Sequence, residues 1–341
     1  MNSTLSTPTV GKFAGCLIGQ CLGDALGFIV EGHPPSTCSR YVDDAVRTGN
    51  THKLRRGPYP FGQYSDDSQL AREMIISIVE CGGFTPVDYA NRIATLFEQD
   101  RVVGRGAATT AAARRLIRGI HWTKSGEPSP SAGNGSAMRA APVGLLCYGD
   151  PDALIRTVVD QSRITHQDPR CAAGSIAIAG AVTLNLQEHN VPIEEFTTRL
   201  SSWVEDFDEI LAEGIQNIPQ WLNQSPSSVA AEVSKVGIAP GSGDGWQGIS
   251  PFVTGSVLWS IYSFLRSPYD YMESICTAIA VGGDVDTTAA MTGAISGTLV
   301  GLDRIPAELA VQVNDAGGWG YEELIHLAGR FHAMVTGILT A

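Results

Sequence analysis

Two sets of glycines that recur every four residues constrain the fold of this chain more than any other feature of its sequence. One set lies near each end of the chain: Gly11, Gly15, Gly19, Gly23 and Gly27, then Gly293, Gly297 and Gly301. Residues four apart share a face of an α-helix, and a glycine inside a helix costs about 1 kcal/mol relative to alanine. Close approach of a second backbone is the usual compensation. We therefore predict that these two helices pack directly against each other.

The rest of the sequence predicts further helices and no sheet. No stretch alternates polar and apolar residues with period two, and no linker separates two hydrophobic cores. With 341 residues, of which 43% are hydrophobic and 17% charged, the chain can bury a large core. We predict a single all-α domain of many helices over residues 10–341, after a frayed start at 1–9, with its polar motifs gathered at one end.

Approximate helix boundaries follow from the apolar pattern, and loops follow from clusters of Gly, Pro and Ser. The expected helices cover 66–80, 87–118, 140–146, 170–186, an outer pair within 192–222, and 306 onward. The expected loops or irregular segments are 32–60, 125–135 and 225–244, with an exposed loop at 241–246. The segment 245–265 has no charge and is long enough to span a bilayer. Its Pro251, its glycines and its lack of a basic flank favour a buried helix instead.

Charge and cysteine content narrow the class of protein. The net charge of −12 argues against general nucleic-acid binding, which requires a basic surface. Seven scattered cysteines without a CxxC pair are typical of reduced thiols in the cytoplasm. The first ten residues are polar and resemble no secretory signal. We expect a cytoplasmic protein that acts as a monomer and does not bind membranes.

Two acidic clusters, each at the start of a predicted apolar helix, contain the candidate metal ligands. They are Ser65, Asp66 and Asp67, and Asp284, Asp286 and Thr287. Carboxylate and hydroxyl oxygens are hard ligands that suit Mg²⁺, Mn²⁺ or Ca²⁺ rather than Zn²⁺. Helix capping is the alternative, but one aspartate is enough to cap a helix. Because two clusters each carry two aspartates, we favour a metal site.

Three further candidates are weaker when they are judged from the residues alone. The Gly-Asn-Gly-Ser segment 133–136 precedes an apolar run, where backbone N–H groups at a helix start could hold a phosphate. The same residues are equally typical of a tight turn. His166 precedes a predicted helix, where a histidine more often caps or packs, and Glu31 begins a loop, where a single glutamate is usually a solvated charge.

In their order and spacing these motifs resemble the ADP-ribosylglycohydrolase family, which includes the dinitrogenase reductase-activating glycohydrolases and the ADP-ribosylarginine and ADP-ribosylserine hydrolases. The matching segments are 23–31, 65–68, 133–139, 165–166 and 282–287, within a resemblance that extends over about residues 10–331. The resemblance implies an all-α orthogonal bundle with a binuclear Mg²⁺ site, or Mn²⁺ in some members. The implied reaction is hydrolysis of the bond between C1″ of the distal ribose and an acceptor.

The resemblance also implies a role for each candidate residue. Six match metal ligands: Ser65, where the family usually has Thr, and Asp66, Asp67, Asp284, Asp286 and Thr287. Five match positions around the substrate: Gly133, Asn134, Gly135 and Ser136 in the turn that holds the diphosphate, and His166 near the ligand. Three match the catalytic set: Glu31 as the gating or catalytic acid, with Asp67 and Asp284. Asp24 matches the family motif too, at a position behind the ligands rather than among them.

The implied substrate is an ADP-ribosylated protein or a small ADP-ribose conjugate. An arginine linkage ranks ahead of serine or O-acetyl linkages because 133–146 resembles the arginine-directed branch more closely. A guanidinium would need a carboxylate at the acceptor mouth, and the loop 125–132 offers only Glu127. Two alternatives from other classes stay open: a non-catalytic relative, such as the structural lens crystallins of the family, and a metal-dependent phosphoesterase acting on a nucleotide.

Overall fold

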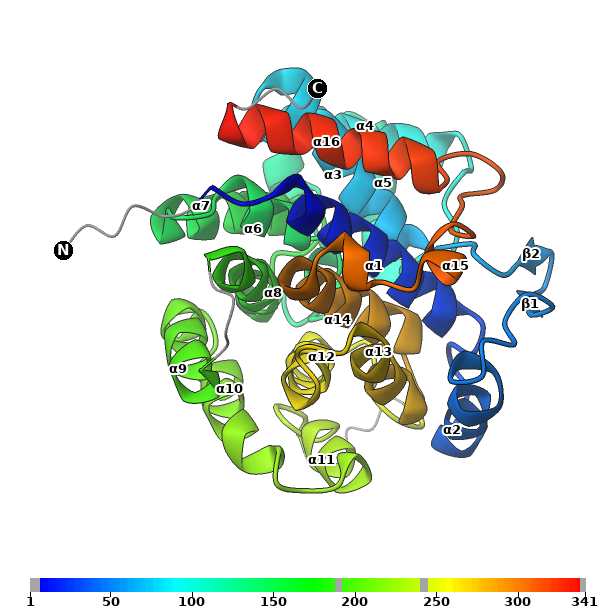
Figure 1. The fold of residues 1–341 in the computed structure, drawn as a ribbon. Coiled ribbons are helices and arrows are strands. Elements are labelled where there is room, and N and C mark those ends of the chain that lie inside the picture. Colours follow the sequence, from blue (N-terminus) through cyan, green and yellow to red (C-terminus); the bar gives the residue numbers. More distant parts are fainter. Residues whose placement is uncertain (1–6, 188–191, 240–244, 338–341) are drawn as a thin grey trace.

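The computed structural model describes residues 7–187, 192–239 and 245–337, and these residues are predominantly helical (Figure 1). The α-helices are α1 Val10–Phe28, α2 Pro35–Tyr41, α3 Asp66–Cys81, α4 Pro86–Glu98, α5 Ala107–Ile117, α6 Ala141–Leu146, α7 Pro151–Arg163, α8 Pro169–Gln187, α9 Ile193–Val204, α10 Glu209–Trp221, α11 Pro226–Val233, α12 Val253–Arg266, α13 Tyr271–Ala280, α14 Val285–Val300, α15 Ala307–Ala310 and α16 Tyr321–Thr336. A short antiparallel hairpin joins β1 Arg55–Arg56 to β2 Tyr59–Pro60. The predicted all-α class is confirmed.

Helices α1 and α14 pack against each other along their glycine stripes at the centre of the molecule (Figure 1). A Cβ atom placed on Gly15 would lie 2.3 Å from the carbonyl oxygen of Gly297, and one on Gly19 would lie 2.4 Å from that of Gly293. No side chain fits at that separation, so the two backbones are in direct contact. The predicted pairing of the two glycine helices is confirmed.

The remaining helices surround this pair in layers. α3 and α16 pack on α1, while α8, α12 and α13 pack on α14. α9 and α10 lie outside α8 and α12 and form the outer helix pair predicted within 192–222 (Figure 1). The largest buried side chains include Trp259, Tyr262, Phe13 and Phe331, which lie between the layers. This packing leaves the N-terminal ends of α3 and α14 close to each other.

Three predicted segments differ from the structure. The single helix predicted over 87–118 is two helices, α4 and α5, because the chain turns through left-handed conformations at Asp100 (φ 56°) and Gly104 (φ 75°). The segment 225–244, predicted to be irregular, contains α11, whose N-terminus is capped by the Ser225 hydroxyl accepting from the Ser228 N–H. The loop predicted over 32–60 contains α2 and the β hairpin.

Two other predictions concern the chain ends and the membrane. The frayed start at 1–9 falls mainly on residues 1–6, which lie outside the described residues, as do 241–244 of the predicted exposed loop. The uncharged segment 245–265 contributes α12, which is buried against α8, α10, α13 and α14. Among the described residues, no helix combines the length and the apolar character needed to cross a bilayer.

Candidate metal centre and ligand cleft

The two acidic clusters lie side by side at the N-terminal ends of α3 and α14. Asp66 and Asp67 open α3, whereas Asp284 immediately precedes α14 and Asp286 lies in its first turn. All four aspartates line one cleft of about 590 Å³, and each is no more than 5% exposed. Carboxylates are favoured near a helix N-terminus, where the helix dipole is positive. Thr287 also lines this cleft.

Helix α1 holds both clusters in place. A Cβ on Gly27 would lie 2.3 Å from the Val285 carbonyl oxygen, so α1 touches the backbone of the first turn of α14. One helical turn away, Asp24 accepts hydrogen bonds from the Ser65 N–H at 2.9 Å and from the Ser68 N–H and hydroxyl at 3.1 and 2.7 Å. Asp24 is fully buried and does not line the cleft. The glycine stripe therefore positions the site as well as the core.

Burial and mutual repulsion raise the proton affinity of all four carboxyl groups. Loss of solvent contact is the main cause, and it raises the pKa of Asp67 to about 6 and that of Asp284 to about 7. The pKa values of Asp66 and Asp286 are raised well above their ordinary range, first by burial and then by the charges of Asp67 and Glu31 respectively. Such a group of buried carboxylates is stable in its charged form only next to cations.

The donor atoms present fit a hard divalent cation. Oxygen Oδ1 of Asp67 is buried and has no hydrogen-bond partner among the described residues, which is uncommon for a carboxylate. Carboxylate oxygens of Glu31, Asp284 and Asp286 lie within 4.8 Å of one another. With the Thr287 hydroxyl, which donates to Asp284 Oδ1 at 3.3 Å, the cluster offers the oxygen ligands that Mg²⁺ and Mn²⁺ take.

Ser65, predicted as a ligand, lies just behind the cleft. It is fully buried and does not line the cleft, and its hydroxyl donates to Asp67 Oδ2 at 2.7 Å. In this structure the hydroxyl therefore orients the carboxylate of Asp67.

Glu31 reaches the cluster from the end of α1 and is paired with an arginine that the sequence analysis did not single out. Its carboxylate accepts a hydrogen bond from Arg56 Nη1, and the same nitrogen donates to the Phe28 carbonyl oxygen at 2.8 Å. The Arg56 guanidinium lies over the Phe28 ring, 4.4 Å from its centre. Arg56 sits on the β hairpin, and no local sequence pattern indicates that this hairpin returns to the end of α1.

The Gly-Asn-Gly-Ser turn contacts the acidic cluster and lines the cleft through its first three residues. Its Asn134 side chain donates to Asp284 Oδ2 at 2.5 Å and to the Ser256 hydroxyl at 3.0 Å. Gly133 and Gly135 line the cleft, whereas Ser136 does not. The Ser136 hydroxyl bonds instead to buried hydroxyls of α7 and α8. The turn is a single 3₁₀ turn, and the following helix α6 begins only at Ala141.

His166 packs against this turn. A Cβ on Gly135 would lie 2.8 Å from His166 Cε1, so only glycine allows the ring to approach this closely. His166 Nδ1 lies 2.8 Å from the Thr165 hydroxyl oxygen. Burial, reinforced by the positive charge of Arg139, lowers the pKa of His166 to about 3. The imidazole is therefore neutral and available as a hydrogen-bonding group beside the cleft.

The N-terminus of α5 is part of the cleft that the sequence did not reveal. Residues 104–109 line the cleft, and the Gly106 N–H points to Asp66 Oδ2 at 3.5 Å. The sequence predicts a single helix over 87–118, so this stretch falls inside that helix and no helix N-terminus is expected there. The break between α4 and α5 exposes a helix N-terminus, which attracts anionic groups. It lies beside the Gly-Asn-Gly turn, since a Cβ on Gly135 would be 3.0 Å from the Thr109 hydroxyl oxygen.

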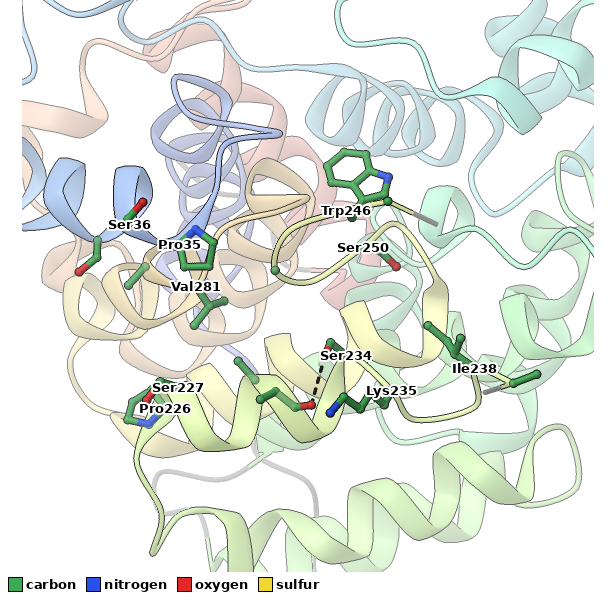
Figure 2. A pocket seen from close by; sticks show the side chains of 17 residues that line it. Pro35, Ser36, Pro226, Ser227, Ser234, Lys235, Ile238, Trp246, Ser250 and Val281 are labelled. Atoms are coloured by element: carbon green, nitrogen blue, oxygen red, sulfur yellow. Dashed lines mark hydrogen bonds between the residues drawn. The ribbon is translucent and has the colours of Figure 1, made fainter. Parts of the chain in front are cut away.

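A second hollow of about 1400 Å³ adjoins the cleft, and Trp246 lines both. Figure 2 shows Pro226, Ser227, Ser234 and Lys235 along one side of it and Trp246 on the facing loop. Lys235 is the charged side chain among its described lining residues, and no carboxylate lines it. The acidic chemistry therefore belongs to the smaller cleft.

Comparisons with known proteins agree with this geometry. A family model described as ADP-ribosylglycohydrolase matches residues 6–337. An uncharacterized protein of Archaeoglobus fulgidus is 30% identical over 84% of this chain and 87% of its own length. Human ADP-ribosylhydrolase ARH3 is 27% identical over 95% of this chain and 93% of its own. For the ADP-ribosyl-[dinitrogen reductase] glycohydrolase of Rhodospirillum rubrum the identity is 25%, covering 87% of each chain.

The fold also matches a solved structure. A chain of an "ADP-ribosylglycohydrolase-related protein complex" superimposes with a TM-score of 0.72 over 96% of this chain and 98% of that one, at 24% sequence identity. At this identity the likeness establishes the shared fold.

Proposed function

The chain belongs to the ADP-ribosylglycohydrolase family and is a glycosyl hydrolase of that family; on this premise we propose that it releases ADP-ribose from an acceptor with the help of two divalent cations, Mg²⁺ or Mn²⁺. The observation that carries the proposal is the meeting of four buried aspartates from two distant motifs on one cleft. Asp66, Asp67, Asp284 and Asp286 would hold the ions, together with the Thr287 hydroxyl.

The distribution of side chains around the cleft suggests how the substrate lies. The N-terminus of α5 and the turn at Gly133–Gly135 lie next to each other in the lining of the cleft, where their backbone N–H groups would bind a diphosphate. The neutral His166 ring is next to that turn. The distal ribose would then extend toward Asp67 and Asp284, so that C1″ and the acceptor lie near Glu31.

The proposed chemistry needs a water on C1″ and a proton route. When bound, the cations supply positive charge that orients the ribose hydroxyls and lowers the proton affinity of a water. Glu31 would accept the proton of the attacking water, or deliver it to the departing acceptor, as positive charge develops on the ribose ring. The new bond joins the water oxygen to C1″, and the bond from C1″ to the acceptor breaks. Asp67 and Asp284 belong to the acidic clusters and also line the cleft, so we assign them to orienting the water and the ribose.

The charges at the mouth favour an uncharged acceptor. Glu127, the carboxylate that could face a guanidinium, pairs with Arg115 and does not line the cleft. Glu31 is already paired with Arg56, and Arg105, which also lines the cleft, is paired with Asp100. Among the carboxylates of the described residues that line the cleft, only Glu31 lies outside the four aspartates, and its pairing leaves no free carboxylate to bind a cationic arginine. We therefore rank an oxygen-linked acceptor, serine or O-acetyl, ahead of arginine, which the resemblance of 133–146 alone had favoured.

Two smaller proposals concern the setting of the enzyme. All seven cysteines are free thiols, which supports a reducing compartment such as the cytoplasm. A single chain supplies every residue assigned to the cleft, which supports activity as a monomer on an ADP-ribosylated protein or a small conjugate.

Product analysis tests the proposed function. The purified protein is offered an ADP-ribosylserine peptide, an ADP-ribosylarginine peptide and O-acetyl-ADP-ribose, with Mg²⁺ and with EDTA. We expect free ADP-ribose in the presence of Mg²⁺, no turnover with EDTA, and faster release from the oxygen-linked substrates. AMP or ribose phosphate as the product would identify a phosphoesterase instead. Release from none of the three would favour a non-catalytic relative of the crystallin kind.

A further inference from the structure

Arg139, three residues after the Gly-Asn-Gly-Ser turn, is a fully buried arginine whose contacts are all with neutral groups. Its guanidinium donates to Gln161 Oε1 and to the Gln161 carbonyl oxygen, both at 3.0 Å, and to the Thr165 hydroxyl oxygen at 2.7 Å. It also lies over the Tyr89 ring, 5.6 Å from its centre. Among the described residues Arg139 forms no ion pair. A buried charge without a counter-charge is costly, so its presence needs an explanation other than stability.

The Thr165 hydroxyl connects Arg139 to His166. A guanidinium can only donate hydrogen bonds, so the Thr165 oxygen accepts from Arg139 Nη2. Within the described residues, the other hydrogen-bond partner of this buried hydroxyl is His166 Nδ1, at 2.8 Å. The hydroxyl proton is therefore donated to Nδ1. If Nδ1 carried a proton instead, both neighbours would donate to the Thr165 oxygen and its own buried proton would have no acceptor, which is unfavourable.

The second ring nitrogen of His166, Nε2, lies against the turn proposed for the diphosphate. A neutral imidazole carries one proton, so Nε2 is protonated when Nδ1 accepts. A Cβ on Gly133 would lie 3.6 Å from Nε2, and one on Gly135 would lie 3.3 Å from it. His166 and both glycines line the cleft. Within the described residues the ring side chain bonds through Nδ1, which leaves the Nε2 N–H for a ligand.

The charge of Arg139 also keeps the ring neutral. Burial comes first and the Arg139 charge second among the causes that lower the pKa of His166 to about 3. The carboxylate of Asp168 acts in the opposite direction, but it is paired with Arg170 at 2.8 Å. A neutral ring is required for this arrangement, because an imidazolium has no nitrogen that could accept from Thr165.

We propose that Arg139 and Thr165 are positioning residues that hold His166 in its Nε2–H tautomer, so that the ring donates a hydrogen bond to the diphosphate of the substrate. This inference rests on the proposed function, which places the diphosphate at the Gly133–Gly135 turn. The ring then adds a side-chain donor to the backbone N–H groups of the turn and of α5. The buried charge of Arg139 fixes which nitrogen of His166 carries the proton.

The tautomer can be read without metal or substrate from the imidazole ¹⁵N chemical shifts. For His166 we expect a protonated Nε2 and an unprotonated Nδ1 in the wild type and in Thr165→Ser, which keeps the hydroxyl. In Thr165→Val, where a methyl group replaces the hydroxyl, the two tautomers should interchange, so the two nitrogen shifts should move toward each other. The His166 signals are assigned by their absence from the spectrum of His166→Ala.

The affinity for ADP-ribose in the presence of Mg²⁺, measured by isothermal titration calorimetry, connects the tautomer to ligand binding. Thr165→Val should weaken binding by about tenfold, the scale of one lost hydrogen bond to a charged group, whereas Thr165→Ser should bind as the wild type does. In turnover, Thr165→Val should raise KM by a similar factor and change kcat at most a few-fold, since the ring contacts the diphosphate and not C1″.

A double-mutant cycle and a matched control separate this role from general support of the fold. In the His166→Ala background, Thr165→Val should cause no further loss of ADP-ribose affinity, because Thr165 acts through the ring. Thr183→Val removes another buried hydroxyl, which donates to the Gly144 carbonyl oxygen at 2.7 Å and does not line the cleft. That variant should bind ADP-ribose as the wild type does.

Three results would overturn the proposal: a protonated Nδ1 in the wild type, wild-type affinity in Thr165→Val, or the same loss from Thr165→Val with and without the His166 ring. If Thr165→Val fails to fold, Thr165→Ala removes the same hydroxyl and completes the cycle. A wild-type protein that has the expected tautomer but neither binds nor releases ADP-ribose would overturn the proposed function, and with it the role of His166 toward a diphosphate.

Discussion

Asn134 Nδ2 donates a hydrogen bond of 2.5 Å to Asp284 Oδ2, across 150 residues of sequence. This bond joins the turn proposed for the diphosphate to the cluster proposed for the metal ions. The Asn134 amide also donates to the Ser256 hydroxyl, so its orientation is fixed from a third element, α12. One side chain thus couples the two halves of the cleft.

Removing this amide should loosen the metal site without changing its ligands. In Asn134→Ala, Asp284 loses the donor that orients its carboxylate, and we expect Mn²⁺ affinity to fall by about tenfold, the usual scale for a group that orients a ligand. Isothermal titration calorimetry measures the change. Asn223→Ala, at an exposed site after α10, should bind as the wild type does. Unchanged Mn²⁺ affinity in Asn134→Ala would mean that the turn does not orient the metal ligands.

The glycine stripe yields a stability prediction with an internal control. A methyl group on Gly19 would lie 2.4 Å from the Gly293 carbonyl oxygen, so Gly19→Ala should force α1 and α14 apart and destabilise the fold by about 2–3 kcal/mol. Gly11→Ala adds the same methyl group to the same helix, where the nearest atom is 3.7 Å away. That variant should be as stable as the wild type, or up to about 1 kcal/mol more stable. Urea unfolding measures the free energy of unfolding of both variants. Equal losses of stability in the two would mean that α1 and α14 do not touch as described.

His166 should remain neutral through the physiological range. Burial lowers its pKa from the ordinary 6.5 to about 3, so the unfolded chain binds a proton that the folded chain does not. The contribution of this residue to stability is therefore complete above pH 6.5 and is lost as the pH falls toward 3. Imidazole nitrogen chemical shifts should show an uncharged His166 ring at pH 5. An imidazolium signal from His166 at that pH would contradict its burial beside Gly135.

The core of the fold was predictable from sequence because it depends on periodic spacing. Gly15 and Gly297 lie in runs with the period of one helix face, and that pattern survives whatever else surrounds it. The paired aspartates could also be recognised from the sequence, because the members of each cluster lie within three consecutive residues. That they share one cleft follows from the packing of α1 on α14, which brings Asp286 next to Gly27.

Features that depend on long-range contacts or on single backbone angles were not predictable. The alanine-rich stretch after Ala107 has a strong helix preference, and the break before it depends on the left-handed conformations of Asp100 and Gly104. The Arg56–Glu31 pair exists because a short hairpin folds back on Phe28. Ser136 matched a substrate-binding motif, yet its small side chain points into a hydroxyl network in the core.

The most direct test of the proposed function follows metal occupancy and turnover in the same sample. Metal-free protein is titrated with Mn²⁺ while bound metal and released ADP-ribose are measured together, for the wild type, Asp66→Asn, Asp284→Asn and the exposed control Asp303→Asn. We predict two ions per wild-type and Asp303→Asn chain, release of ADP-ribose that rises with occupancy, and sharply weakened binding with loss of turnover in the other two variants. Release of ADP-ribose by the metal-free protein, or full occupancy in both Asp66→Asn and Asp284→Asn, would contradict a catalytic metal centre built on these aspartates.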